Sequence, residues 1–139
     1  MFCCEIISGL WIGDCDIMNS HKFVDENKIQ LIFNFTVDSR LIHREGVRLI
    51  SVPVTEQLSN SLDVMELNKY LKDILNHIKN NTDKCNILLS CHDGRTVPAL
   101  VVALYIIKYT SSPPETVRGL LQSKCPDIPL DYDLSGFDI

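Results

Sequence analysis

The sequence predicts an α/β domain, and three observations lead to this prediction. Short runs rich in β-branched and aromatic residues alternate with stretches of helical periodicity. No internal repeat, low-complexity tract or linker separates these segments. At 139 residues and 45% hydrophobic content, the chain has enough apolar side chains to build one ordinary core. We therefore expect residues 1–139 to form a single domain of the α/β class.

The first half of the chain supplies most of the predicted strands. Residues 5–7 (EII) and 10–13 (LWIG) are short β-rich runs, and a polar segment from Met18 to Asn27 follows them. Two further apolar runs of strand length lie at Leu31 to Phe35 (LIFNF) and Val47 to Val54 (VRLISVPV). We expect each of these four runs to be a strand.

An amphipathic helix is predicted from Leu62 to about Lys79. Ser61 is a plausible N-cap, and the polar run at residues 80–83 (NNTD) ends the pattern. The apolar positions recur at helical spacing and mark the face that we expect to be buried: Val64, Leu67, Leu71, Ile74, Leu75 and Ile78.

A short apolar strand and a strongly apolar helix follow. Residues 86–90 (NILLS) have strand character, and Val97 to Tyr109 is apolar on nearly every face. A helix of that kind is buried on all sides, so we expect it at the centre of the domain. Pro98 fits its first turn, where no backbone N–H is needed.

The last predicted helix opens at residues 112–115 (SPPE). Ser112 is expected to cap it, with Glu115 as the capping-box partner, and Pro126 to stop it. Its buried residues are expected to be Val117, Leu120 and Leu121.

Cys91 begins the loop between the apolar strand and the central helix. Such a loop directs several backbone N–H groups at one point, and the helix dipole adds positive potential there. Gly94 allows the backbone to curl without a Cβ clash. We expect the pKa of the Cys91 thiol to be lowered in this field, which would make it a thiolate able to attack phosphorus or sulfur.

The chain resembles the dual-specificity protein phosphatases of the cysteine-dependent tyrosine phosphatase superfamily. The resemblance covers almost the whole sequence and implies a central, mostly parallel mixed sheet flanked by helices on both faces. It rests on the order and spacing of several segments: GLWIGD at 9–14, IQLIFNFT at 29–36, ISVPV at 50–54, VALYIIKYTSSPPETVRGLLQSKCPDI at 102–128, and GF at 136–137.

This chain departs from the signature of the family at three of the five defining positions. The family pattern is His-Cys-x-x-Gly-x-x-Arg-Ser/Thr, and the corresponding residues here are Ser90, Cys91, Gly94, Val97 and Pro98. In the family, the arginine holds two phosphate oxygens and stabilises the transition state, which valine cannot do. Losing one such charge stabiliser lowers the rate by roughly 10²- to 10³-fold. The hydroxyl after the arginine helps to expel the thiolate, and proline has none.

The family's general acid is an aspartate on a loop before the cysteine. The resemblance places Glu56 or Gln57 at that point, with Asp63 as a further candidate if the loop is longer. Glu56 is a longer-armed substitute for protonating the leaving oxygen, and its geometry must be satisfied before its pKa matters.

The other residues of the phosphate loop are His92, Asp93, Arg95 and Thr96. Arg95 lies two residues before the signature arginine, so we expect a structural ion pair with a nearby carboxylate instead of a phosphate contact. His92 and Asp93 are expected to face solvent. Asp93 opposes phosphate binding unless it points outward, because it adds negative charge to an anion site.

Four functional hypotheses remain open. The first is a pseudophosphatase that acts by binding a phosphoprotein or another signalling partner. The second is an active phosphatase that forms a phosphocysteine at Cys91 with Glu56 and one of Arg95, Arg40 or Arg44. The third is a sulfurtransferase, because CHDGRT at 91–96 also resembles the rhodanese loop. The fourth is an interaction domain without an anion site.

Composition limits the partners and the compartment. The net charge is −5, and no cluster of Lys and Arg is present, which argues against nucleic acid and anionic membranes as partners. The N-terminus has no signal-peptide pattern, so we expect a cytoplasmic protein. The six cysteines contain no C-x-x-C pair, and the histidines have no ligand spacing, so neither a metal nor another cofactor is expected. The chain also stops soon after Phe137, where relatives continue, and we expect that an exposed apolar patch there would favour a dimer.

Overall fold

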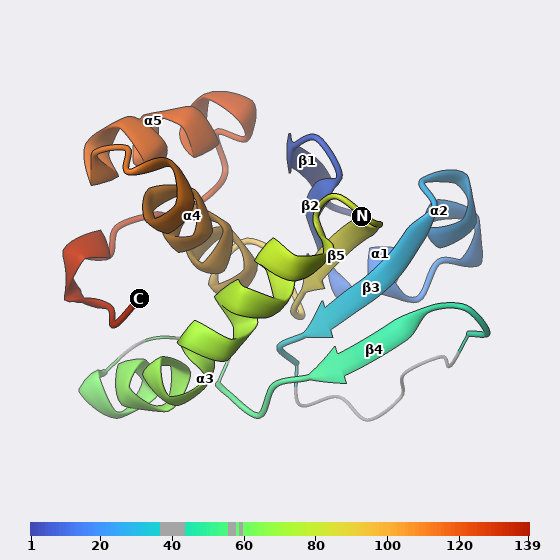
Figure 1. Ribbon diagram of the computed structural model, residues 1–139, viewed down its shortest axis with the longest axis horizontal. Coiled ribbons are helices and arrows are strands. Elements are labelled where there is room, and N and C mark those ends of the chain that lie inside the picture. The colour runs from blue at the N-terminus through green and yellow to red at the C-terminus, as the bar shows by residue number, and fades with distance from the viewer. Residues whose placement is uncertain (37–43, 56–57, 59) are drawn as a thin grey trace.

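A five-stranded sheet forms the centre of the computed structural model, which describes residues 1–36, 44–55, 58 and 60–139. The strand order is β1-β2-β5-β3-β4 (Figure 1). β1 pairs antiparallel with β2, and all other pairs are parallel. The predicted mostly parallel mixed sheet is therefore confirmed. The strands are β1 (Cys3–Ile7), β2 (Leu10–Gly13), β3 (Ile29–Asn34), β4 (Arg48–Ser51) and β5 (Asn86–Ser90).

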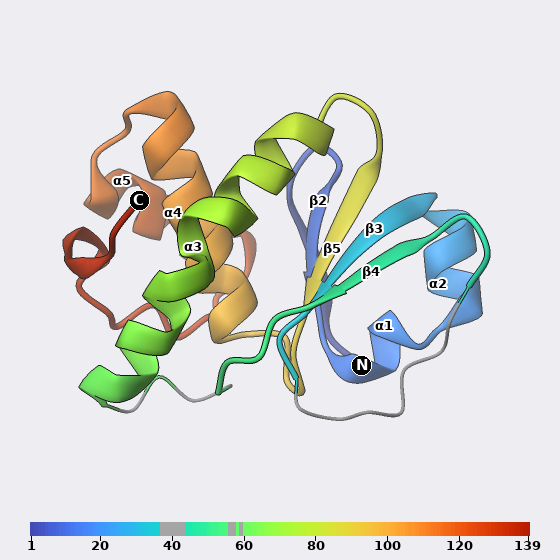
Figure 2. The same ribbon diagram turned by 60° about the horizontal axis from the view of Figure 1, so that its bottom comes forward.

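Helices cover both faces of this sheet, as expected (Figure 2). The short helices α1 and α2 pack on one face, and the longer helices α3, α4 and α5 lie on the other. None of the helices in the described ranges is long and apolar enough to cross a membrane. The helices are α1 (Cys15–Met18), α2 (His21–Glu26), α3 (Ser61–Asn81), α4 (Val97–Thr110), α5 (Pro114–Lys124) and the 3-10 turn η1 (Leu134–Gly136).

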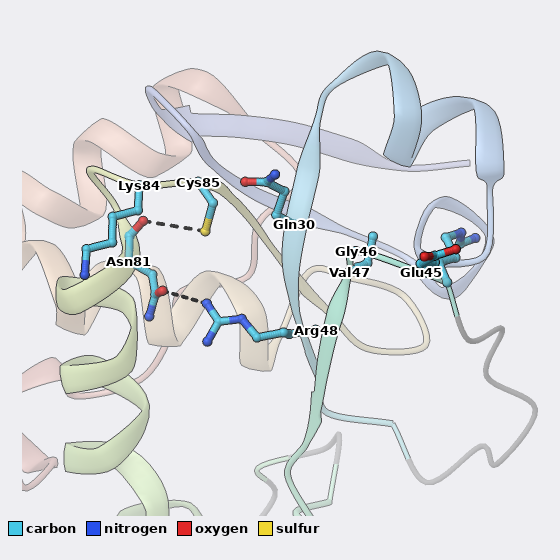
Figure 3. Close-up of a pocket in the computed structure, with 9 residues that line it drawn as sticks. Gln30, Glu45, Gly46, Val47, Arg48, Asn81, Lys84 and Cys85 are labelled. Atoms are coloured by element: carbon cyan, nitrogen blue, oxygen red, sulfur yellow. Dashed lines mark hydrogen bonds between the residues drawn. The ribbon is translucent and has the colours of Figure 1, made fainter.

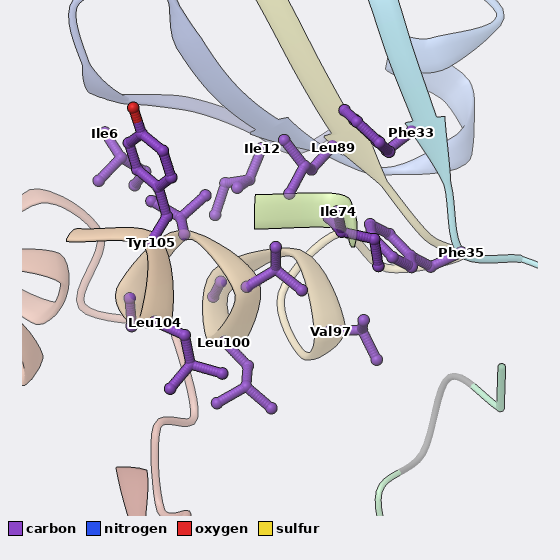
Figure 4. Packing of buried hydrophobic residues seen from close by; sticks show 14 of the residues in the cluster. Ile6, Ile12, Phe33, Phe35, Ile74, Leu89, Val97, Leu100, Leu104 and Tyr105 are labelled. Carbon is purple, nitrogen blue, oxygen red and sulfur yellow. The ribbon is translucent and has the colours of Figure 1, made fainter. Parts of the chain in front are cut away.

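The central strands are apolar on both faces because each face is covered. Successive side chains of a strand point to opposite sides. Phe33 and Leu89 therefore join the core beneath α3–α5, whereas Ile32 and Leu88 join the smaller core beneath α1 and α2. Figure 4 shows Phe33 and Leu89 above the buried side of α4.

α4 begins at the predicted residue, Val97, ends one residue later than predicted, at Thr110, and has the central position that its composition predicts. Every residue from Val97 to Ile106 is buried, and Pro98 lies in the first turn. Ser111, in the left-handed conformation with φ +56°, ends the helix. α4 follows β5 directly through the loop that contains Cys91, so its burial fixes the position of that loop.

The polar segment from Met18 to Asn27 contains helical structure that its polarity did not predict. Asp14 and Ser20 cap α1 and α2 through hydrogen bonds to the Ile17 and Phe23 N–H groups. Each helix is so short that it contributes only a few buried side chains, among them Met18 and Val24. So few apolar positions do not reveal a helical period.

The predicted strand from Val47 to Val54 is shorter than expected. β4 ends at Ser51, and Val52 and Val54 are buried beyond it in irregular backbone. The Val52 N–H still donates to the Asn34 carbonyl of β3 at 2.8 Å, and the apolar character of both valines fits their burial.

Both predicted helix caps were wrong. Asn60, not Ser61, caps α3 by accepting a hydrogen bond from the Asp63 N–H at 3.0 Å. Pro113 occupies the N-cap of α5 and makes no side-chain cap bond. The Glu115 Oε1 atom instead lies 3.5 Å from the Arg118 Nη1 atom. Leu120 was expected to be buried, but it is 37% exposed.

Candidate functional site

Cys91 lies immediately after β5 and before α4, as the sequence predicts. The loop from Cys91 to Thr96 therefore stands at the carboxyl edge of the parallel strands, with the N-terminus of α4 behind it. Ligands bind preferentially at this edge in α/β sheets. The Cys91 residue is only 1% exposed.

Gly94 is required by the close approach of the loop to the end of β2. Its φ is +75°, a conformation that residues with a side chain rarely adopt. A Cβ at this position would lie 2.6 Å from the Asp14 nitrogen and still closer to the Gly13 carbonyl carbon. Gly94 therefore allows the backbone to curl, as predicted, and also allows the loop to pack closely against the end of β2.

The loop is held against the turn between β2 and α1 by further hydrogen bonds. The Ser90 hydroxyl donates to the Asp14 carbonyl at 3.0 Å. The Cys15 N–H donates to the His92 carbonyl at 3.3 Å. The Asp14 carboxylate accepts from the Phe2 N–H at 2.6 Å and so attaches the N-terminal segment to the same turn. Sequence reasoning named Ser90 and His92 only as positions of the loop. It missed the supporting roles of Asp14, Cys15 and Phe2, because nothing in the local pattern links these residues to Cys91.

The expected lowering of the Cys91 pKa was wrong. Burial raises the pKa of this thiol to about 12. The Gly94 N–H, 3.2 Å from the sulfur, lowers this pKa but does not reverse the effect of burial. The carboxylate of Asp93 raises it further. At neutral pH, Cys91 is therefore a protonated thiol and a weak nucleophile.

We expected the Asp93 carboxylate to point away from the loop, but it points into the loop. Its Oδ1 atom accepts hydrogen bonds from the Cys91 thiol at 3.3 Å and from the Arg95 N–H at 2.9 Å. Asp93 is therefore exposed to solvent and at the same time in contact with the buried sulfur.

Arg95 contacts an aromatic ring and a carbonyl group in place of the expected carboxylate partner. Its guanidinium carbon lies 4.0 Å from the centroid of the Phe2 ring. Nη1 also donates to the Asp93 carbonyl at 3.2 Å. The Arg95 side chain is thereby held against the N-terminal segment.

The resemblance aligns Val97 and Pro98 with the arginine and the hydroxyl residue of the family signature. Both are buried in the first turn of α4, and Val97 is fully buried in the main hydrophobic core (Figure 4). Thr96 is the N-cap residue of α4, but its side chain makes no cap hydrogen bond. No cationic side chain enters the loop from these three positions.

His92 is exposed at the side of the loop, as expected for a solvent-facing residue. Its Nδ1 atom lies 3.8 Å from the Cys15 sulfur, so its imidazole is next to a different thiol from Cys91.

Arg44, one of the alternative arginines, is placed far along the sheet from the loop. It donates to the His21 Nδ1 atom at 3.2 Å and to the Met18 carbonyl at 3.0 Å. It also lines a groove of about 580 Å³ at the amino ends of β3 and β4. Figure 3 shows this groove with Gln30 of β3 and Arg48 of β4. Cys91 follows the carboxyl end of β5, so Arg44 and the loop lie at opposite edges of the sheet.

Some of the predicted site residues are not placed by the structure. Glu56, Gln57 and Arg40 lie outside the described residues. Asp63 is described and belongs to the first turn of α3. No group of three or more His, Cys, Asp or Glu side chains is arranged to bind a metal within the described ranges.

Comparison with solved structures identifies the fold. No family model and no curated protein sequence matches the chain. Human DUSP28 superposes with a TM-score of 0.79 at 14% identity, covering 96% of this chain and 87% of that chain. A mouse dual specificity phosphatase complexed with zinc tungstate gives 0.80 at 17% identity, with coverages of 96% and 81%.

A third similar structure is named as a phosphatase-like interacting protein and not as a phosphatase. The human tyrosine phosphatase-like serine/threonine/tyrosine-interacting protein superposes with a TM-score of 0.77 at 14% identity, covering 91% of this chain and 86% of that chain. These matches show that the chain has the fold of the dual-specificity phosphatases.

Proposed function

We propose that this phosphatase-fold protein is catalytically inactive or severely impaired and acts by binding a phosphoprotein or another signalling partner. The observation that carries the proposal is the hydrogen bond from the Cys91 thiol to the Asp93 carboxylate. A nucleophilic cysteine must be a thiolate, and this thiol is buried and donates its proton to a negatively charged acceptor.

The lack of a phosphate-binding guanidinium among the residues of the loop, all of which are described, supports the same conclusion. Phosphoryl transfer depends on cationic groups that neutralise the equatorial oxygens of the transition state. Val97 contributes only a buried isopropyl group, and Arg95 is held by Phe2 and the Asp93 carbonyl. The two defects are independent, since one concerns the nucleophile and the other concerns the transition state.

Other features fit a binding function in the cytoplasm. The loop joins β5 to the N-terminus of α4, with Gly94 packed tightly against the end of β2. One structural neighbour is named as a phosphatase-like interacting protein, which is a precedent for binding on this fold. No disulfide joins the six cysteines, all of which lie in the described ranges, and this fits a reducing compartment.

The alternative of an active phosphatase requires other helpers. Cys91 would have to lose its proton, and an arginine would have to reach the loop. The positions of Arg44 and Arg95 argue against both as that arginine. Glu56 and Arg40 remain the residues on which this alternative depends. The phosphatase fold of the neighbours also favours these hypotheses over a rhodanese-like sulfurtransferase.

Hydrolysis of an aryl phosphate tests the proposal directly. We expect the wild type and Cys91→Ser to release product at the same background rate. Turnover by the wild type that disappears in Cys91→Ser would overturn the proposal. The His92→Ser variant, which changes a neighbouring exposed residue, controls for general effects of altering the loop.

A second pair of variants asks whether the loop is an intact but incomplete site. Val97→Arg with Pro98→Ser introduces the guanidinium and the hydroxyl, and Pro98→Ser alone is the matched control. Because an arginine at a fully buried position can prevent folding, circular dichroism must first show a native spectrum. Activity of the double variant only, lost again when Cys91→Ser is added, would support an impaired phosphatase loop.

A further inference from the structure

The carboxylate of Asp93 occupies a specific position within the loop. Oδ1 lies 3.3 Å from the Cys91 sulfur and 2.9 Å from the Arg95 nitrogen. It therefore accepts one hydrogen bond from the thiol and another from a backbone N–H group. A negatively charged oxygen that lies beside the sulfur and accepts from a loop amide resembles an oxyanion bound in a loop of this kind.

Two of the loop amides that could hold an external anion are already engaged. The Arg95 N–H is directed at Asp93, and the Gly94 N–H is directed at the Cys91 sulfur at 3.2 Å. Pro98 has no N–H group. An incoming phosphate would have to displace the Asp93 carboxylate before it could reach the Arg95 amide.

The negative charge of residues near the loop also opposes the binding of an anion. Burial, and after it the carboxylates of Asp131 and Asp93, raise the pKa of Tyr132. The two carboxylates thus lie within electrostatic reach of one hydroxyl at this side of the loop. The one Lys or Arg side chain of the loop, Arg95, is stacked on Phe2 and donates to the Asp93 carbonyl. A dianionic ligand would meet like charge at close range without a compensating cation from the loop itself.

We propose that Asp93 is an internal anion that closes the loop to phosphate-like oxyanions and thereby determines its ligand specificity. The inference rests on the proposed binding function and narrows it: the partner is held without a phosphate group in the loop. Asp93 acts as a specificity residue here, and Cys91 is the hydrogen-bond donor that helps to position it.

Tungstate binding tests this inference, with inorganic tungstate as the probe and calorimetry as the measurement. In Asp93→Asn the negative charge is removed while size and shape are kept. We expect this variant to bind tungstate at least about tenfold more tightly than the wild type, because one like-charge contact is gone. Asp83→Asn is the matched control, since it makes the same charge change at an exposed turn after α3. It should bind tungstate as the wild type does.

A site-specific readout places the tungstate in the loop. We expect tungstate to slow the alkylation of Cys91 by iodoacetamide in Asp93→Asn and to leave the alkylation of wild-type Cys91 unchanged. Asp93→Ser provides a second variant in case Asp93→Asn does not fold. Equal tungstate affinity of the wild type and both Asp93 variants would overturn the inference.

These experiments distinguish a failure of the inference about Asp93 from a failure of the proposed function. Wild-type phosphatase activity would contradict the proposed function, whereas tight tungstate binding by an inactive wild type would contradict only the role of Asp93. Asp93→Asn is not expected to hydrolyse an aryl phosphate, because Val97 still supplies no guanidinium.

Discussion

Gly94 packs directly against Gly13, so that the base of the loop and the end of β2 are in backbone contact. A side chain on Gly94 would overlap the Gly13 carbonyl group, and its φ of +75° is unfavourable for any residue with a Cβ. We expect Gly94→Ala to lower the free energy of unfolding by about 3 kcal/mol or more, as measured by urea denaturation.

Substitutions of two other glycines separate the effect of the positive φ on the free energy of unfolding from the effect of the close packing. Gly46 has a φ of +78°, but a Cβ added there would meet no atom within 4 Å, so Gly46→Ala should cost only about 1–2 kcal/mol. Gly119 lies inside α5 with open space around it, and Gly119→Ala should stabilise by about 0.5–1 kcal/mol. A Gly94→Ala variant as stable as Gly46→Ala would contradict the packing contact.

The pH dependence of Cys91 alkylation follows from its raised pKa. Only the thiolate reacts, and its fraction grows about tenfold per pH unit while the pH stays below the pKa. With a pKa of about 12, the alkylation rate of Cys91 should rise from pH 7 to pH 10 without a plateau. Mass spectrometry of the iodoacetamide-treated native protein measures this rate. A plateau near pH 7 would show a thiolate and would contradict the assignment.

Asn34 connects the end of β3 to the backbone that follows it. It is 1% exposed, donates to the Thr36 carbonyl and the Ser51 hydroxyl, and accepts from the Thr36 N–H at 3.0 Å. Asn34→Ala removes these hydrogen bonds at a buried position and should lower the free energy of unfolding by about 2 kcal/mol in urea. Asn80→Ala, on the exposed side of α3, should change it by less than about 0.5 kcal/mol.

The central position of α4 predicts a strong dependence on its apolar side chains. Leu100 is fully buried, and Leu100→Ala should cost about 2–5 kcal/mol through lost burial and the cavity left behind. Leu120 on α5 is 37% exposed, so Leu120→Ala should cost less than about 1 kcal/mol. Thermal denaturation of both variants checks the difference, and equal losses would contradict the placement of the two helices.

The sequence was most informative where many side chains repeat one pattern. The apolar surface of α4 and the strand runs around Phe33 and Leu89 predicted the α/β class, because periodicity and burial are properties of whole segments. The caps were less predictable. Asn60 and Ser61 are both good cap residues, and the choice between them depends on the backbone angles that enter α3.

The sequence by itself determined which groups the loop contains: a cysteine, a glycine, an aspartate, and no arginine or hydroxyl at the two signature positions. Only the tertiary structure decided what these groups do. Cys91 keeps its proton because packing of the loop on Gly13 and Asp14 removes the sulfur from water, and because the Asp93 carboxylate is directed inward. The desolvation arises from contacts between segments distant in the chain, which no local pattern records. The carboxylate is held by its near neighbours Cys91 and Arg95, but its inward direction depends on the folded conformation of the loop.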